Sequence, residues 1–281
     1  MARGSFLRIM RPLNCGMLGL AVWVGEFVSR PSVIPFFQTV FGFLTAFFLC
    51  AYSMVVNDIY DVEVDRVNQP TRPIPSGAIS VGGATRLSVL FLVVGMAFSV
   101  LSLTPLAIAI AAAYAFLSWV YNYWAKKSGL PGNLIVASSL AIPFVYGGAV
   151  AGGSIFSSLL LVMAFTSFFS GVGREVVKGI ADVEGDAKRG IGSLARTRGA
   201  KGAAAVGAVF FLLAVVTSWL PLFLALANVI YILGVWIPDA IFILLAVSIL
   251  RNSGAENAHK VKSRALIGML IGLIVFIGGG L

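Results

Sequence analysis

Long apolar runs alternate with short polar connections along the 281 residues of the chain. Each run approaches the roughly 20 residues that a helix needs to cross the hydrocarbon core of a bilayer. Continuous runs favour helices over a membrane β-barrel, whose strands give short segments of alternating hydrophobicity. The pattern predicts nine transmembrane helices, over residues 15–30, 36–57, 85–103, 105–123, 133–151, 154–177, 203–219, 221–250 and 262–280. The eighth run is too long for one straight crossing, so we expect it to tilt or to kink at Pro238.

The composition agrees with a polytopic membrane protein. Hydrophobic residues make up 59% of the chain and charged residues only 11%, whereas a soluble domain carries about 25% charged residues. We expect one transmembrane domain over residues 1–281, with no cleavable signal peptide, because Pro12 and Asn14 interrupt the basic start. Cys15 and Cys50 both fall in apolar runs and are expected to be buried thiols.

With nine helices, almost all basic residues fall on one side of the membrane. Apart from Arg30, every Lys and Arg falls at the N-terminus, in a connection that follows an even-numbered helix, or at the end of a helix next to such a connection. Because cytoplasmic loops of membrane proteins are enriched in Lys and Arg, this predicts a cytoplasmic N-terminus and an external C-terminus. The net charge of +9 therefore follows from the orientation in the membrane and requires no nucleic-acid partner.

Acidic residues gather in two clusters, at 58–65 and 175–186, which together hold eight of the eleven Asp and Glu residues: Asp58, Asp61, Glu63, Asp65, Glu175, Asp182, Glu184 and Asp186. Each cluster follows an even-numbered expected helix, on the cytoplasmic side. Four helices separate the clusters, which indicates a fold of two four-helix halves plus one helix around a central cavity. Carboxylates near membrane depth are costly and mark a functional site by default.

The spacing within each cluster is helical. Asn57, Asp61 and Asp65 would share one face of a helix extending from the second span. In the second cluster, Lys178, Asp182 and Asp186 recur every four residues behind Arg174. Caps, solvated charges or a structural pair between Lys178 and Asp182 are the alternative interpretation.

Stacked carboxylates repel one another unless a cation lies between them. An all-oxygen set without nearby His or Cys favours Mg²⁺, which binds one or two carboxylates together with substrate phosphates. Several cations could bind such phosphates: Arg66, Arg72, Lys126, Lys127 and Lys178. Glu63 and Glu184 fall off both stripes.

At these residues the chain resembles the UbiA superfamily of intramembrane prenyltransferases. The family's NDxxDxxxD motif is matched by Asn57, Asp58, Asp61 and Asp65, and "RPIPSG" follows at 72–77. Its second motif, DxxxD, is matched by Asp182 and Asp186. A Tyr-x-x-x-Lys element of the family is similar to Tyr123 with Lys127, or with Lys126 in the other register.

The resemblance implies transfer of a prenyl group from its diphosphate to an acceptor at the cytoplasmic membrane boundary. It implies that two Mg²⁺ ions are held by Asn57, Asp61, Asp65, Asp182 and Asp186, with both stripes converging on one diphosphate. The implied substrate-binding residues are Asp58, Arg66, Arg72, Tyr123, Lys126, Lys127 and Lys178.

The acceptor is open at this point. "GREVVKGIADVEGDAKRG" is similar to archaeal members that prenylate geranylgeranylglyceryl phosphate in ether-lipid synthesis. An aromatic acceptor such as 4-hydroxybenzoate, on the route to quinones, is the alternative. An ion-coupled transporter is the rival class, since transporters also hold ionisable residues among helices, and Asp239 is the residue that would fit it.

Overall fold

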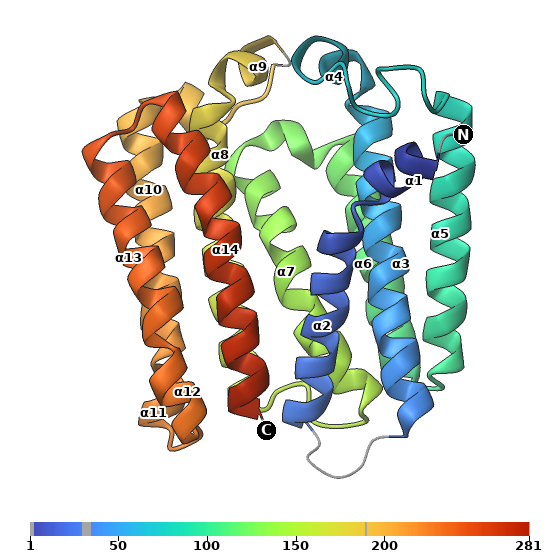
Figure 1. Ribbon diagram of the computed structural model, residues 1–281, viewed down its shortest axis with the longest axis vertical. Helices are drawn as coiled ribbons and strands as arrows, with labels where there is room; N and C mark the ends of the chain where they lie inside the picture. Colours follow the sequence, from blue (N-terminus) through green and yellow to red (C-terminus); the bar gives the residue numbers. More distant parts are fainter. Residues whose placement is uncertain (1–2, 30–34, 189, 281) are drawn as a thin grey trace. The chain divides into compact units, whose positions relative to one another are not determined.

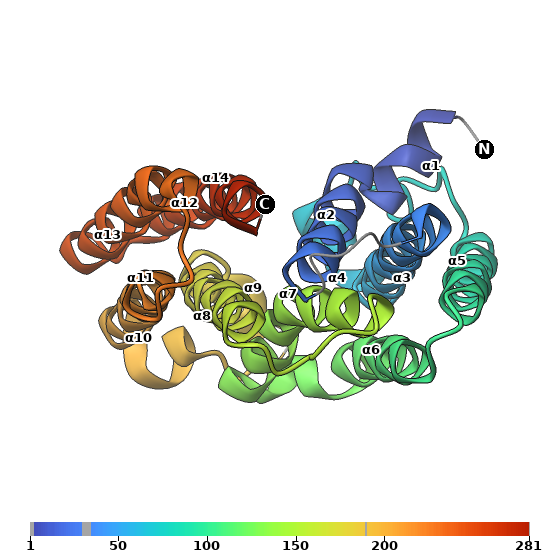
Figure 2. The same ribbon diagram turned by 90° about the horizontal axis from the view of Figure 1, so that it is seen from below.

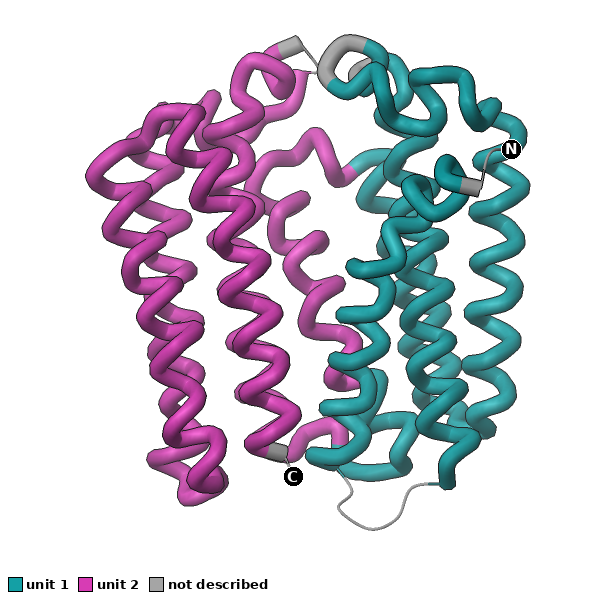
Figure 3. Tube along the Cα trace, in the orientation of Figure 1, with its two compact units in different colours: residues 1–124, 146–154 teal, residues 125–145, 155–281 magenta. Residues whose placement is uncertain are grey.

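The computed structural model describes residues 3–29, 35–188 and 190–280, and all of its regular secondary structure is helical (Figure 1). The chain divides into two compact units (Figure 3). Unit 1 comprises residues 1–124 and 146–154, and unit 2 comprises residues 125–145 and 155–281.

Unit 1 is built around one central helix. Its helices are α1 (Arg3–Met10), α2 (Pro12–Ser29), α3 (Phe36–Tyr60), α4 (Val62–Asn68), α5 (Val81–Leu101) and α6 (Pro105–Tyr123). Helix α3 packs against α2, α5 and α6, an arrangement visible end-on in Figure 2. The short α4 continues from α3 at the end of the unit where α1 also lies (Figure 1).

Unit 2 is also organised around one helix. Its elements are the 3-10 helix η1 (Ala125–Ser128), most of α7 (Leu130–Val150), α8 (Ser158–Ala181), α9 (Val183–Lys188), α10 (Leu194–Ser218), α11 (Leu220–Phe223), α12 (Val229–Gly234), α13 (Trp236–Arg251) and α14 (Ala255–Gly280). Helix α8 packs against α10 and α14, and α13 packs against both of these. The short α9 continues from α8 as α4 continues from α3.

The expected helical membrane fold is confirmed. Eight helical segments of the described residues are long and apolar enough to cross a membrane, and they coincide with the second to ninth expected spans. Helix α2 occupies the position of the first expected span and is not among these eight. Helices α3 and α8 are the most buried of the eight: 50% and 61% of the residues in their 18-residue apolar stretches are buried. Both acidic clusters therefore follow a central helix.

The eighth spanning segment starts later than expected, and its helix is interrupted near Pro238. Residues 220–223 form α11 next to the end of α10, and the spanning segment begins at Val229. The break between α12 and α13 falls at Val235. Pro238 has no N–H to donate to the carbonyl of Gly234, four residues earlier, so the helical hydrogen bonds are interrupted there.

Two glycines allow helices of unit 1 to approach closely. A Cβ atom on Gly42 of α3 would lie 2.3 Å from Oε1 of Glu26, and one on Gly147 would lie 2.1 Å from the carbonyl oxygen of Val22. The fully buried Glu26 carboxylate thus fits against α3 because residue 42 has no side chain.

Asp239 forms part of a buried polar contact in unit 2. Its carboxylate oxygens lie 3.0 and 2.9 Å from the Ser218 hydroxyl at the end of α10. The Tyr231 hydroxyl of α12 donates to the Ser218 carbonyl at 2.7 Å. This contact ties α10 to α12 and α13, and it gives Asp239 a structural explanation that needs no transported ion.

We expect Asp239→Ala to lower the free energy of unfolding by about 1–2 kcal/mol, because a buried interhelical hydrogen bond is lost. Thermal unfolding of the purified protein in detergent measures this. Glu256→Ala is the matched control, since Glu256 is an exposed acid paired with Lys260 on α14 and should change stability by less than about 0.5 kcal/mol. Equal losses in the two variants would contradict the structural role.

Candidate active site

The first acidic pair lies at the junction of α3 and α4. Asp61 is the residue between the two helices; its N–H donates to the Asn57 carbonyl at 3.0 Å, and the Asp65 N–H donates to the Asp61 carbonyl at 2.8 Å. The helical hydrogen bonds thus continue through the junction and keep these residues on one face. The Asn57 amide also donates to Asp61 Oδ2 at 3.1 Å, and Asp61 and Asp65 are both buried. The predicted shared face is present in unit 1.

The second acidic pair repeats this arrangement in unit 2. Asp182 lies between α8 and α9; its N–H donates to the Lys178 carbonyl at 3.0 Å, and the Asp186 N–H donates to the Asp182 carbonyl at 2.9 Å. In both units, the first aspartate ends the central helix and the second follows one turn later. This pair is more open, since the Asp182 side chain is 38% exposed and that of Asp65 is 5% exposed.

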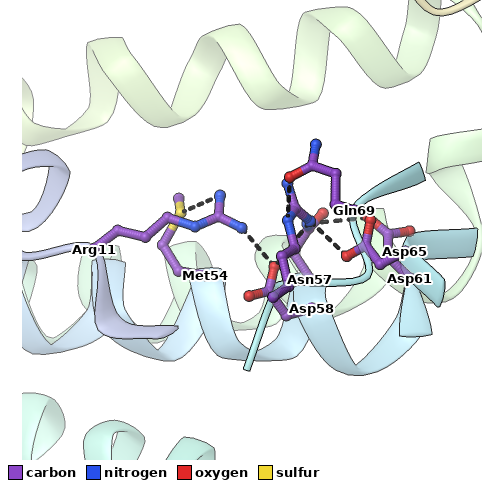
Figure 4. Close-up of polar contacts among 8 residues, drawn as sticks. Arg11, Met54, Asn57, Asp58, Asp61, Asp65 and Gln69 are labelled. Atoms are coloured by element: carbon purple, nitrogen blue, oxygen red, sulfur yellow. Dashed lines mark hydrogen bonds and ion pairs between the residues drawn. The ribbon is translucent and has the colours of Figure 1, made fainter. Parts of the chain in front are cut away.

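Asp58 lies beside the first pair and holds two arginines (Figure 4). Its Oδ1 atom accepts from Arg11 at 2.5 Å and from Arg72 at 3.4 Å. Arg72 also contacts Asp65 Oδ2 at 2.5 Å and Gln69 Oε1 at 2.7 Å. Because only 3% of the Asp58 side chain is exposed, these cations compensate the burial of its charge. Asp58 is thus an anchor for guanidinium groups.

Glu175 organises the basic residues of unit 2. Arg174 contacts Glu175 Oε1 at 2.5 Å, and Lys178 Nζ contacts Glu175 Oε2 at 3.0 Å. Glu175 is buried, and the Arg174 Nε atom is buried without a partner among the described residues. The carboxylate therefore holds Arg174 and Lys178 at the end of α8, almost two turns before Asp182.

Lys178 and Asp182 each contact a charged side chain of unit 2. Lys178 contacts Glu175, while Asp182 Oδ1 accepts from Lys262 of α14 at 3.2 Å. Lys262 therefore reaches the second motif from a helix 80 residues away.

The remaining predicted substrate residues differ in their surroundings. Arg66 contacts the exposed Glu63 at 2.9 Å and is itself 59% exposed, so it lies apart from the buried carboxylates. Tyr123 is exposed and stacks on Trp119, with ring centroids 5.2 Å apart; it also meets Tyr60 edge-on, next to Asp61. The Tyr123 ring is thus placed near the first acidic pair.

The two lysines of the Tyr-x-x-x-Lys element differ as well. Lys127 is exposed, and its carbonyl accepts from the Gly192 N–H at 3.2 Å. Lys126 is half-buried. The two lysines of this element therefore differ in exposure.

The donor sets fit magnesium shared with a substrate. Among the described residues, no group of three or more His, Cys, Asp or Glu side chains could hold a metal ion. Mg²⁺ seldom uses a cage made only of protein ligands; it binds one or two carboxylates, waters and substrate phosphates. Asn57, Asp61 and Asp65 offer such a partial oxygen set, and so do Asp182 and Asp186.

Sequence reasoning did not identify Arg11, Glu175 or Lys262 as site residues. Arg11 and Lys262 were explained by the cytoplasmic excess of positive charge, and 47 residues separate Arg11 from Asp58. Glu175 gave a usable signal, because an acid placed between Arg174 and Lys178 at the end of an apolar helix needs cationic partners.

The chain is similar to known proteins along its whole length. Residues 18–274 match the UbiA prenyltransferase family. Digeranylgeranylglyceryl phosphate synthase of Archaeoglobus fulgidus is 37% identical, covering 94% of this chain and 90% of its own. The enzyme of the same name from Sulfolobus acidocaldarius is 35% identical, covering 99% and 98%.

Solved structures share the fold. One described as digeranylgeranylglyceryl phosphate synthase in membranes has 33% identity and a TM-score of 0.78, covering 99% of this chain and 98% of its own. A UbiA homolog from Archaeoglobus fulgidus bound to GPP and Mg²⁺ has 18% identity and a TM-score of 0.69, covering 97% and 99%. The second likeness concerns the fold alone.

We expect Glu175→Ala to lower the free energy of unfolding by about 1–3 kcal/mol, because it leaves the partly buried Arg174 without its counter-ion. The unfolding midpoint in detergent measures the loss. Glu184→Ala, which removes an exposed acid from α9, is the control and should change stability by less than about 0.5 kcal/mol. If Glu175→Ala is as stable as the control, Glu175 does not anchor these cations.

Proposed function

The chain belongs to the UbiA prenyltransferase family, and on this premise we propose that it transfers a geranylgeranyl group from geranylgeranyl diphosphate to geranylgeranylglyceryl phosphate. The product is a digeranylgeranylglyceryl phosphate, and inorganic diphosphate is released. The names of relatives that are 31–37% identical over nearly the whole chain support this choice of acceptor.

The observation that carries the proposal is the repeated position of the acidic pairs. In each unit an aspartate ends the most buried helix, and a second aspartate follows one turn later on the same face. Cations surround both places: Arg11 and Arg72 in unit 1, and Arg174, Lys178 and Lys262 in unit 2. Carboxylates for metal ions combined with cations for phosphate oxygens suit a diphosphate better than a transported inorganic ion.

In unit 1, Asn57, Asp61 and Asp65 are proposed to hold one Mg²⁺, and Arg72 to bind a diphosphate oxygen. Arg72 is kept in position by Asp58 and Gln69. The exposed Arg66 and Tyr123 are proposed to complete the substrate contacts from α4 and α6.

In unit 2, Asp182 and Asp186 are proposed to hold a second Mg²⁺. Lys126 or Lys127, together with Lys178, would neutralise charge on the diphosphate, and Glu175 would position Lys178. That both ions serve the same diphosphate rests on the resemblance of the two motifs to those of the family.

The chemistry is an ionisation followed by capture of the cation. Bound metal ions would supply positive charge to the leaving diphosphate. The bond between the prenyl C1 carbon and oxygen breaks with its electron pair on the diphosphate, while Arg72 and the lysines stabilise the developing charge. The acceptor hydroxyl oxygen then bonds to C1 and passes its proton to an oxygen of the departing diphosphate. Apolar helices keep water away from the allylic cation.

The orientation and the extent of the domain are part of the proposal. The distribution of Lys and Arg supports a cytoplasmic N-terminus and active site and an external C-terminus. The match of the family to residues 18–274 supports one transferase domain in which both units take part.

We expect Asp61→Ala and Asp182→Ala each to lower turnover by about 100-fold or more, because each removes a proposed metal ligand at the leaving group. Release of diphosphate from geranylgeranyl diphosphate is measured in detergent with Mg²⁺ and acceptor, and chelation should stop it. Glu63→Ala and Glu184→Ala remove acids from the same short helices but off the stripes, and they should stay within about threefold of wild type.

The same assay compares two acceptors. Geranylgeranylglyceryl phosphate should support turnover and 4-hydroxybenzoate should not. Turnover with 4-hydroxybenzoate and none with geranylgeranylglyceryl phosphate would show that the acceptor is aromatic and not the lipid. Turnover that persists in both aspartate variants, or in chelator, would reject the metal-dependent mechanism.

We expect Ser76→Cys to resist a membrane-impermeant maleimide in intact cells, and Phe156→Cys to react. Ser76 lies between α4 and α5 on the proposed cytoplasmic side, Phe156 lies between α7 and α8 on the opposite side, and both are exposed. Background labelling should be low because Cys15 and Cys50 are buried. Labelling of Ser76→Cys but not of Phe156→Cys would contradict the proposed orientation and indicate the opposite one.

A further inference from the structure

The Arg11 guanidinium contacts the first acidic cluster but lies outside the sequence motifs of the family. It lies at the break between α1 and α2, and it contacts Asp58 Oδ1 through Nη2 at 2.5 Å and Met54 Sδ through Nη1 at 3.5 Å. These contacts bring the start of the chain against the cytoplasmic end of α3.

The Arg11 side chain retains capacity to bind an anion. A guanidinium has five N–H donors, and among the described residues one is directed at Asp58 and one at the weakly accepting sulfur of Met54. The side chain is 30% exposed. Arg72 has a second carboxylate partner in Asp65, whereas Asp58 is the one carboxylate that Arg11 contacts among the described residues.

Arg11 and Arg72 extend in different directions from Asp58. Arg72 spans from Asp58 to Asp65, on the side of the acidic pair. Arg11 spans from Asp58 to Met54, on the other side (Figure 4). Met54 is one helical turn before Asp58, or about 5 Å along α3. A diphosphate held by Arg72 and the acidic pair would therefore leave Arg11 facing a second, neighbouring position.

The backbone of Arg11 is costly for a residue with a side chain. Its φ of 53° lies in the left-handed region, which L-residues other than glycine seldom adopt. Pro12 follows and starts α2. A glycine would relieve this cost but would remove the guanidinium, so the charged side chain coincides with a conformation that does not favour it.

We propose that Arg11 binds the phosphate of the acceptor, as a substrate-binding residue separate from those that hold the diphosphate. This inference rests on the proposed function. In geranylgeranylglyceryl phosphate the reacting hydroxyl and the phosphate are on neighbouring carbons, so the acceptor phosphate must lie within a few ångströms of the reacting C1 carbon. Two guanidinium groups on opposite sides of one buried carboxylate suit two such adjacent anions.

The test is the preference for a phosphorylated acceptor. In Arg11→Gln, the KM for geranylgeranylglyceryl phosphate should rise by about tenfold to a hundredfold, the effect expected for loss of a charge-assisted hydrogen bond. The KM for geranylgeranyl diphosphate should stay within about threefold. The ratio of kcat/KM for this acceptor over phosphate-free geranylgeranylglycerol should fall by a similar factor, and Arg11→Lys should recover part of it.

A second readout is inhibition by sn-glycerol 1-phosphate. It should compete with the acceptor in wild type, and its inhibition constant should rise in Arg11→Gln. Arg8→Gln is the matched control, because it removes an exposed charge from α1 and should leave the acceptor preference unchanged.

The outcomes separate the possible failures. An unchanged acceptor preference in Arg11→Gln overturns the inference, and so does an equal rise in both KM values. A lower melting temperature with an unchanged preference would assign Arg11 a structural role only. If wild type releases no diphosphate with any acceptor, the proposed function itself fails.

Discussion

Compensation of buried carboxylates by neighbouring cations is the constraint on which both acidic sites depend. A charge at the end of a membrane helix is expensive unless it is paired and hydrogen-bonded. Asp58 and Asp65 meet this requirement through Arg11 and Arg72, and Glu175 meets it through Arg174 and Lys178. The stabilising cations are thereby fixed beside the carboxylates that we propose as metal ligands. Under this proposal the same ion pairs stabilise the fold and position the cations for an anionic substrate.

The two units place their aspartates in the same way but pair their buried carboxylates with different cations. In both, a central helix ends at an aspartate and a short helix carries the second aspartate. In the first site, the carboxylate that holds the arginines is Asp58, which is itself part of the motif. The second uses Glu175, which precedes its motif by almost two turns, and it adds Lys262 from a distant helix. The two units thus share the spacing of the proposed metal ligands but differ in the residues that anchor the neighbouring cations.

The sequence predicted what depends on local periodicity. Apolar run lengths located the spanning helices, and four-residue spacing placed Asn57, Asp61 and Asp65 on one face because helical hydrogen bonds continue through the junction at Asp61. Contacts between distant segments were not predictable in this way. Nothing in the spacing links Arg11 to Asp58, and the excess of positive charge on one face already explained Arg11. Asp239 stood out as a membrane acid, but only the positions of Ser218 and Tyr231 give it a structural role.

Anchoring by Asp58 also bears on how one fold can serve different acceptors. The proposed metal-binding face needs Asn57, Asp61 and Asp65 in register, so under this proposal its residues can change little without loss of the leaving-group chemistry. Arg11 lies outside that face and is attached to it by a single carboxylate. A substitution there would alter the charge next to the reacting carbon while the ion pair between Arg72 and Asp65 persists. If Arg11 binds the acceptor phosphate as proposed, the side of Asp58 that faces Met54 is the place where acceptor selectivity can vary without disturbing the departure of diphosphate.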